Sequence, residues 1–453
     1  MFDQMFKHFI DNQIFHPNHH GGLPNHSTVT ALIQLYDLWL NAAENHEILA
    51  ALLLDLSAAY DLLDHDILIK KLVHYGFDSE SRKYVKSYLE NRKQIVQVES
   101  KRSKPKEIGE TAVPQGSILG GFFFIVFQND FPASSELGEA ILFVDDDTEN
   151  VSDRDHDTLV DKLKDLAKSS TQWVRDNRMV CAGEKTKLLI VATRETRERN
   201  RTPPVQIEVC GKAVEESPAE KLLGVIVSND LSWRTHLHGN NKTGKDKITG
   251  LLTKLSQRVG MLKRLAKVMP ENKFRNVSQG IFTSKLIYCI QLFGNVWGVP
   301  NLDENQRRFS AFTKDDMRKL QILENRVLRL ETGLSQDTPL TLLLEKAKKM
   351  SVMQQTAFHS IMTVHRVVTS GQPGYLAKKF KLRKEGDGVF PYRHTNTIVI
   401  PDVELTLSRG GFCYRGAFLW NSLPANMRSG MSTEAFKSEL RRWVRTNIEP
   451  RPP

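Results

Sequence analysis

Apolar and polar positions in the first hundred residues follow two different periods. A helix over 27–44 is predicted behind Ser27 and Thr30 by apolar residues that recur at helical spacing: Ala31, Leu32, Leu35, Leu38 and Trp39. The run Ile48–Leu54 is continuously apolar and bounded by polar residues, so it predicts a buried strand that ends at Asp55. The chain therefore begins as a mixture of helix and strand.

The same patterns continue to about residue 230. Helices are predicted over 65–75, 79–91 and Ser117–Asp130, and through the amphipathic series Leu159, Leu163, Leu166, Trp173 and Val174. Two hairpins are predicted: Gln94–Glu99 with Lys106–Thr111 around Lys104-Pro105, and Ala140–Val144 with Glu149–Ser152 around Asp145-Asp146-Asp147. Further strands are expected at Lys187–Thr193, Val205–Val209 and Leu222–Val227.

From about residue 235 the pattern is helical. The stretch Thr397–Pro401 is the strand-like exception, and the chain ends in an amphipathic helix over Ser432–Thr446. We therefore expect an α+β fold in three domains, at 1–230, 231–334 and 335–453.

Composition narrows the class of protein. The chain has 453 residues, of which 40% are hydrophobic and 26% charged, so it can bury real cores and is neither disordered nor fibrous. The four cysteines are far apart in sequence and form no metal-binding motif, which indicates a reducing compartment: Cys181, Cys210, Cys289 and Cys413. The longest apolar run, Ile118–Phe127, is about half a membrane span. We expect an intracellular protein without a membrane partner, in the nucleus or the cytoplasm.

The charge is unevenly distributed. Lys and Arg number 63 against 53 Asp and Glu, a net charge of +10. Residues 111–160 hold ten acids and one base, whereas residues 231–290 hold twelve bases and two acids. An acidic site followed by a basic segment suits a metal-using enzyme that acts on a polyanion, although two ordinary solvated surfaces would give the same pattern.

Carboxylates follow two of the predicted strands. Asp55 ends one apolar run, and Asp145 and Asp146 end another. Carboxylates held close together repel unless a cation lies between them, and hard oxygen ligands favour Mg²⁺. Two such ions activate a hydroxyl and hold a leaving pyrophosphate, which is nucleotidyl-transfer chemistry. By contrast, Asp315-Asp316 has polar flanks at helical spacing and predicts the first turn of a helix.

An ordered set of motifs over about residues 15–300 resembles the palm motifs of reverse transcriptases, and most of all those of non-LTR (LINE-type) retrotransposons of the jockey-like branch. The motifs are LLLDLSAAYDLLDHDIL, AVPQGSILGGFFFIVFQNDFP, ILFVDDDT, WVRDNRMVCAGEKTKLLIV and KLLGVIVSNDLSW. Later segments, such as YRGAFLWNSLP, resemble the C-terminal part of the same elements. The resemblance implies a right-hand polymerase fold with partial fingers, a palm with an antiparallel sheet, a helical thumb and a mostly helical C-terminal extension.

The resemblance also implies roles for individual residues. Asp55 and Asp145 match the metal-binding aspartates, with Asp146 as a supporting ligand, and Lys185 matches a lysine that approaches the leaving pyrophosphate. Tyr60 stands where the family has an aromatic residue that excludes a ribose 2′-OH. The remaining nucleotide-site positions are Leu56, through its backbone carbonyl, Gln115, Gly116 and Phe143. The implied cofactor is a pair of Mg²⁺ ions, for which Mn²⁺ can substitute.

A basic helix is expected in the implied thumb. Lys254, Arg258, Lys263 and Arg264 are interleaved with leucines and Val259, which predicts a helix with one apolar and one basic side. Such a helix can follow phosphates without reading base sequence. An acidic protein partner is the alternative for this helix.

The sequence departs from the family pattern in three places. Leu23 stands where the family has an arginine that contacts the triphosphate, so a charge-assisted contact is lost. Gly120-Gly121 replaces the usual Gly-Pro, a change we expect to be tolerated. Residue 1 already falls within the fingers, and we interpret the chain as derived from a longer element.

These observations support two hypotheses of different classes. The first is an RNA-directed DNA polymerase that takes an RNA template, a DNA primer and deoxynucleoside triphosphates. The second is a catalytically inactive remnant that binds RNA or an RNA–DNA duplex. A third, an RNA-dependent RNA polymerase, is disfavoured because Tyr60 would exclude the 2′-OH of a ribonucleotide.

Overall fold

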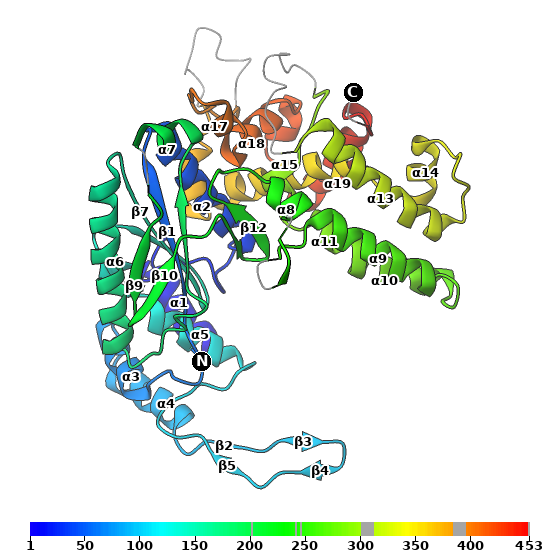
Figure 1. Ribbon diagram of the computed structural model, residues 1–453. Coiled ribbons are helices and arrows are strands. Elements are labelled where there is room, and N and C mark those ends of the chain that lie inside the picture. Colours follow the sequence, from blue (N-terminus) through cyan, green and yellow to red (C-terminus); the bar gives the residue numbers. More distant parts are fainter. Residues whose placement is uncertain (201–202, 241, 245–246, 300–311, 384–395, 452–453) are drawn as a thin grey trace. The chain divides into compact units, whose positions relative to one another are not determined.

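A computed structural model describes residues 1–453 apart from 201–202, 241, 245–246, 300–311, 384–395 and 452–453 (Figure 1). The chain divides into two compact units, which we treat separately. Unit 1 comprises Met1–Ala31 and His46–Pro218, and unit 2 comprises Leu32–Asn45 and Ala219–Pro453. The boundary at Pro218 precedes the one expected near residue 230, and residues on both sides of the expected boundary at 334 fall in unit 2.

A four-stranded antiparallel sheet forms the centre of unit 1. Its strand order is β6-β7-β1-β8, with bounds β6 (Glu139–Phe143), β7 (Asp146–Asp153), β1 (Ile48–Asp55) and β8 (Lys187–Val191). In β1, the alternate residues Ile48, Ala50, Leu52 and Leu54 all belong to one core cluster, because successive side chains of a strand point to opposite faces. The apolar run therefore forms the buried strand that the sequence predicted.

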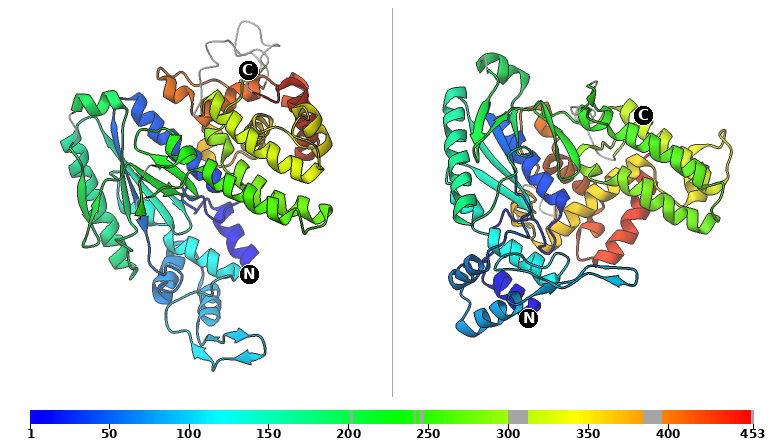
Figure 2. Two further views of the ribbon diagram at one scale, coloured as in Figure 1. Left: turned by 45° about the vertical axis from the view of Figure 1, so that its right-hand side comes forward. Right: turned by 60° about the horizontal axis from the view of Figure 1, so that its bottom comes forward.

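Helices cover this core face. The helix α6 (His156–Asp176) runs along the sheet in both figures (Figures 1 and 2), and its apolar residues Leu159, Leu163 and Leu166 are almost fully buried. The Asp155 side chain begins α6 by accepting a hydrogen bond from the Thr158 backbone N–H. The other helices of unit 1 are α1 (Phe2–Asp11), α3 (His65–His74), α4 (Ser79–Leu89), α5 (Ile118–Gln128), the 3₁₀ turn η1 (Phe131–Ser134) and α7 (Arg194–Asn200).

Short hairpins complete unit 1. They are β2 (Lys93–Gln94) with β5 (Lys106–Glu107), β3 (Gln97–Val98) with β4 (Lys101–Arg102), and β9 (Gln206–Val209) with β10 (Lys212–Glu215). The turn expected at Lys104-Pro105 is wrong. Val98 pairs with Lys101, so the chain reverses at residues 99–100, where Glu99 has a positive φ of 52°.

Unit 2 is mainly helical. Its strands are β11 (Ala219–Leu222) and β12 (Val225–Ser228), and it includes most of α2 (Thr28–Glu44). The further helices are α8 (Arg234–His238), α9 (Leu251–Leu265), α10 (Glu271–Ser278), the π-helical segment η3 (Gln279–Thr283), α11 (Ser284–Ile287), α12 (Ile290–Phe293), α13 (Lys314–Thr332), α14 (Leu340–Ala347), α15 (Val352–Ser370), α16 (Gly374–Lys379), α17 (Thr406–Arg409), α18 (Phe412–Asn421), the 3₁₀ turn η6 (Ala425–Arg428) and α19 (Thr433–Asn447). The α+β class is confirmed.

Two local predictions in unit 2 have opposite outcomes. Asp316 does lie in the first turn of α13, where it forms a capping box with Thr313. The strand expected at Thr397–Pro401 is wrong, because there only Ile398 takes part in a bridge, with Leu382. In the part of the chain that the structure describes, no helix combines the length and the apolar character needed to cross a bilayer.

Candidate functional site

The strands β6 and β7 meet in a two-residue turn that presents the acidic motif. Phe143 and Asp146 form the last registered pair, so the turn consists of Val144 and Asp145. Val144 has a φ of 60°, which is an outlier for a β-branched residue and a local store of strain. The expected tip of three aspartates is therefore wrong, because Asp146 and Asp147 already belong to β7.

Asp55 lies beside this turn. It is the last residue of β1, and its partner in the β1–β7 register is Asp146. Registered partners of an antiparallel pair project from the same face of the sheet, so Asp55 and Asp146 share a face. Asp145 and Asp146 are exposed and Asp55 is half-buried, which leaves all three carboxylates open to solvent.

The third aspartate of the motif has a different environment. Asp147 pairs with Leu54 and is 2% exposed. Its Oδ2 atom accepts a hydrogen bond from the Gln128 side chain of α5. Burial raises the pKa of Asp147 well above its usual range, and the neighbouring Glu149, Asp146 and Asp145 add to the increase. We therefore interpret Asp147 as a buried structural acid.

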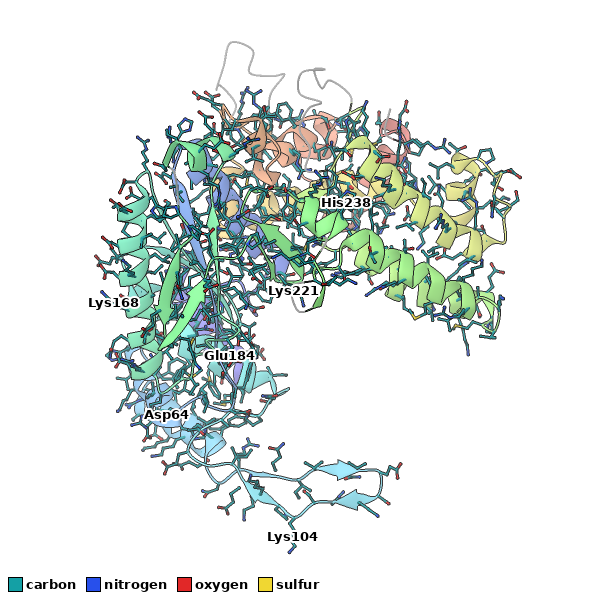
Figure 3. All side chains as sticks on the ribbon, in the orientation of Figure 1. Asp64, Lys104, Lys168, Glu184, Lys221 and His238 are labelled. Carbon is teal, nitrogen blue, oxygen red and sulfur yellow. The ribbon has the colours of Figure 1, made fainter. Side chains whose placement is uncertain are left out.

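Residues 180–186 bring a cation to the end of β1. The Ser57 N–H donates to the Val180 carbonyl at 2.7 Å, and the Ala182 N–H donates to the Asp55 carbonyl at 2.8 Å. Lys185 Nζ lies 3.7 Å from Asp55 Oδ1, with 71% of the lysine side chain exposed. Its neighbour Glu184 is labelled in Figure 3. Lys185 thus lies beside a proposed metal ligand, whereas its predicted approach to a leaving pyrophosphate stays a prediction.

Tyr60 lies close to the acidic turn. Its ring stacks on Phe124 of α5, with ring centroids 4.8 Å apart and planes inclined by 19°. Burial, followed by the negative charge of Asp145, raises the pKa of the Tyr60 hydroxyl. The ring is half-buried, so one side of it packs in the core.

The segment before α5 contributes Gln115 and Gly116. Both are exposed, and Gly116 has a φ of 83°, a conformation that favours glycine. The Ser117 side chain caps α5 by accepting a hydrogen bond from the Gly120 N–H at 2.9 Å. A Cβ at Gly120 would lie 2.5 Å from the Pro114 carbonyl oxygen, whereas one at Gly121 would meet nothing within 4 Å. Of the two positions, only 120 lacks room for a side chain and therefore requires glycine.

The two remaining nucleotide-site positions are adjacent to the carboxylates. Leu56 follows Asp55 and is 5% exposed, and its backbone pairs with Cys181. Phe143 is half-buried at the end of β6, directly before the acidic turn.

Sequence analysis missed an N-terminal segment that supports the turn. The His20 N–H donates to the Leu142 carbonyl at 2.8 Å, so residues 18–20 run beside β6. This pairing places Gly21 against the turn, where a Cβ would lie 2.5 Å from Val144 N. The glycine pair after His20 was the available signal. Leu23 follows in the same loop and contributes no charge.

The carboxylates offer the hard oxygen donors that Mg²⁺ prefers. Asp55 and Asp146 share a face of the sheet, and Asp145 is the residue next to Asp146. The three side chains therefore offer carboxylate oxygens, the donor type that a divalent cation requires. Among the residues that the structure describes, however, no group of three or more His, Cys, Asp or Glu side chains is close enough to hold an ion. To serve as a ligand, the Asp55 carboxylate would exchange its contact with Lys185 for one with the cation.

The predicted basic helix is α9, but its cations do not form one side. Lys254 and Arg258 lie near Lys221 of β11 and Lys285 of α11, and the pKa of Lys254 is lowered by burial and by Lys221 and Arg258. Lys263 instead lines a cavity against α13. Arg264 is exposed in the last turn. The expectation of a single basic side is therefore corrected.

Comparison with known families and proteins identifies relatives. The sequence pattern of the family described as reverse transcriptase (RNA-dependent DNA polymerase) matches residues 1–227. The "Probable RNA-directed DNA polymerase from transposon X-element" of Drosophila melanogaster is 25% identical over 349 residues, which cover 76% of this chain and 35% of that protein. The "RNA-directed DNA polymerase from mobile element jockey" of the same species is 24% identical over 324 residues, covering 68% and 31%. The chain thus spans about a third of the length of these relatives.

Solved structures give a weaker likeness. Apo telomerase from Candida tropicalis has a TM-score of 0.36 and 13% identity, covering 83% of this chain and 59% of that one. Telomerase from Candida albicans, solved with a fragment of telomeric RNA, has a TM-score of 0.34 and 12% identity, covering 82% and 57%.

Proposed function

The chain belongs to the reverse transcriptase family, and we propose that it is an RNA-directed DNA polymerase that adds deoxynucleotides to the 3′ end of a primer. The observation that carries this proposal is the Asp55–Asp146 register beside the Val144-Asp145 turn, which gathers carboxylates at one end of two paired strands. The full activity, the RNA template, the DNA primer and the nucleotide substrates are all part of the proposal.

Asp55, Asp145 and Asp146 are the residues that would hold two Mg²⁺ ions, with the Leu56 carbonyl as a further oxygen donor. When bound, such ions supply activation of the primer hydroxyl and charge neutralisation at the triphosphate. Asp55 and Asp146 are held in fixed positions because β1 and β7 are joined by eight registered pairs. This rigidity supports preorganised catalysis.

Lys185 and Tyr60 act on the nucleotide in this proposal. The Lys185 ammonium, beside Asp55 and mostly exposed, would neutralise the leaving pyrophosphate or donate a proton to it. Tyr60 would lie against the incoming sugar, held by its stack on Phe124, and would exclude a 2′-hydroxyl. Gln115, Gly116 and Phe143 complete the proposed nucleotide site.

Basic residues of unit 2 would bind the phosphate backbone. Lys254 and Arg258 lie near Lys221 and Lys285, and the pKa values of Lys254 and Lys285 are lowered first by burial and then by repulsion from neighbouring cations. A phosphate group would relieve that repulsion. Binding of this kind is independent of base sequence, as copying requires.

An inactive nucleic-acid-binding remnant is the second candidate. It is favoured by Leu23 in place of the family's arginine, which removes one contact to the triphosphate. Primer extension on poly(rA)–oligo(dT) with dTTP and Mg²⁺, together with a binding assay on the same duplex, distinguishes the two. We expect extension, whereas binding without extension, even with Mn²⁺, would identify the remnant.

A further inference from the structure

The opposite faces of α9 carry separate groups of cations. Lys254 and Lys263 are nine positions apart, and at about 100° per residue they project from opposite sides of the helix. Lys254 lies near Lys221 and Lys285, whereas Lys263 faces a groove between α9 and α13. The two helices lie side by side in Figures 1 and 2, and both belong to unit 2.

The α9–α13 groove consists of two adjoining cavities, of about 830 and 420 Å³, that share Ile322. The larger is lined by Lys263, Arg326 and Arg329, and the smaller by Lys319. Ile322 lies in the middle of the groove with 51% of its surface exposed, and among the described residues that line either cavity there is no Asp or Glu.

The cations of the larger cavity are available to a ligand. Within the described ranges, Lys263 and Arg326 are exposed and neither takes part in an ion pair with a carboxylate. Arg329 donates to the backbone carbonyls of Ser335 and Gln336 at 3.1 and 3.0 Å, which fixes its guanidinium at the cavity wall. The groove is therefore a preformed concave surface that carries positive charge.

We infer that the α9–α13 groove binds the phosphate backbone of a second nucleic-acid segment, separate from the duplex that engages the Lys254 face. A row of cations suits a regularly spaced polyanion. Lys319 and Arg326, seven residues apart, are separated by about 10 Å along the helix axis, the rise of roughly three nucleotides of one strand. Lys319 is paired with Asp315 at 2.6 Å, so Lys263 and Arg326 are the cations on which the inference rests. Guanidinium groups such as those of Arg326 and Arg329 match phosphate geometry. The inference rests on the proposed function only in taking nucleic acid as the polyanion that the protein handles.

The experiment uses the full chain and two probes. An unlabelled poly(rA)–oligo(dT) duplex is added to saturation, and binding of a fluorescently labelled single-stranded RNA is then measured by anisotropy. Three chains are compared: the natural chain, Lys263→Glu/Arg326→Glu, and Lys378→Glu/Lys437→Glu, which makes the same change of net charge elsewhere on unit 2. Arg326→Gln, which removes charge without reversing it, is the milder variant should the reversal impair folding.

We expect the natural chain and the Lys378/Lys437 variant to bind RNA with the duplex in place. The Lys263/Arg326 variant should bind the RNA at least about tenfold more weakly. The slope of the logarithm of its binding constant against the logarithm of salt concentration should be shallower by about 2. Exclusion of RNA by saturating duplex, or equal loss in both variants, would overturn the inference. Displacement of the RNA by an acidic protein from the natural chain, but not from the Lys263/Arg326 variant, would show that the groove binds an acidic protein and would also overturn the inference. Because RNA binding is measured without nucleotides, failure of extension would affect the proposed function and not this result.

Discussion

Asp55 and Asp146 are registered partners on adjacent antiparallel strands, and their side chains share one face of the sheet of unit 1. The next residue, Asp147, pairs with Leu54 and points to the buried face. A slip of one residue would exchange Asp146 for Asp147 and bury the wrong carboxylate. The two-residue turn at Val144-Asp145 therefore fixes which acids reach solvent.

Lys185→Ala should slow nucleotide addition while leaving nucleotide affinity nearly unchanged. The ammonium lies 3.7 Å from Asp55 Oδ1, beside the proposed leaving group. Loss of a proton donor or charge neutraliser at this position should lower kcat about 10²-fold. Single-nucleotide incorporation kinetics measure the effect. Lys168→Ala is the control, because Lys168 is an exposed lysine of α6 paired with Asp165 (Figure 3). Equal rates for the natural chain and Lys185→Ala would remove Lys185 from the mechanism.

Gly21→Ala should impair catalysis by displacing the acidic turn. The added Cβ would lie 2.5 Å from Val144 N and 2.7 Å from its Cγ2 atom. Because misplacement of catalytic groups by about 1 Å costs roughly 10²-fold, we expect a fall in kcat with little change in KM. The clash should also lower thermal stability, since overpacking at a buried position is destabilising.

Two companion variants test this positioning role. Gly121→Ala introduces the same methyl group where no atom lies within 4 Å, and it should be neutral. Val144→Gly removes the Cγ2 contact at 2.7 Å, retains the backbone N that lies at 2.5 Å, and permits the positive φ without strain, so it should partly rescue Gly21→Ala. Failure of the rescue, or equal activity of Gly21→Ala and Gly121→Ala, would count against the positioning role.

Tyr60→Ala should admit ribonucleotides. The Tyr60 ring stacks on Phe124 at a centroid distance of 4.8 Å, and truncation removes the group that we propose lies against the sugar. The ratio of kcat/KM for dTTP to that for UTP should fall about tenfold or more, the scale expected for losing one steric discrimination. Tyr60→Phe retains the ring and should keep the natural ratio. An unchanged ratio in Tyr60→Ala would reject the sugar-exclusion role.

Stability should fall as pH rises through the range in which Glu149 ionises. Burial raises the pKa of Glu149 from 4.5 to about 7, and Ser170 Oγ donates to its Oε2 atom at 2.5 Å. A raised carboxyl pKa means that the folded state holds the proton more tightly, so this contribution is complete below pH 4.5 and lost by about pH 7. Glu149→Gln keeps the acceptor for Ser170 and removes the ionisation.

Urea unfolding at pH 5 and pH 8 measures this effect. The free energy of unfolding of the natural chain should fall by up to about 3 kcal/mol more than that of Glu149→Gln over this interval, since one pKa unit corresponds to about 1.4 kcal/mol. Parallel pH profiles for the two chains would show that Glu149 does not ionise in this range.

The main elements of the fold could be predicted because their side-chain patterns are local. The apolar run Ile48–Leu54 became β1, and the helical spacing from Leu159 to Val174 became α6. Family resemblance placed Lys185 near the leaving pyrophosphate, which stays a prediction, and the structure places Lys185 beside Asp55.

Other features depend on pairing between distant segments. Asp146 and Asp147 are polar, so their inclusion in β7 follows from backbone pairing with β1 and β6 and not from side-chain pattern. The contact of Gly21 with Val144 joins segments more than a hundred residues apart, which no local periodicity encodes. By contrast, the helical period itself places Lys254 and Lys263 on opposite sides of α9, although the two lie close together in sequence.

The proposed role of Asp145 and Asp146 in polymerisation is tested most directly by primer extension on poly(rA)–oligo(dT) with dTTP and Mg²⁺, with the natural chain and with Asp145→Asn/Asp146→Asn. Asp315→Asn serves as the matched control, since Asp315 lies in the chain's other Asp-Asp pair, at the start of α13. We expect extension by the natural chain and by Asp315→Asn, and none by the double variant, which should still bind the duplex. Extension by the double variant at the natural rate would contradict that role.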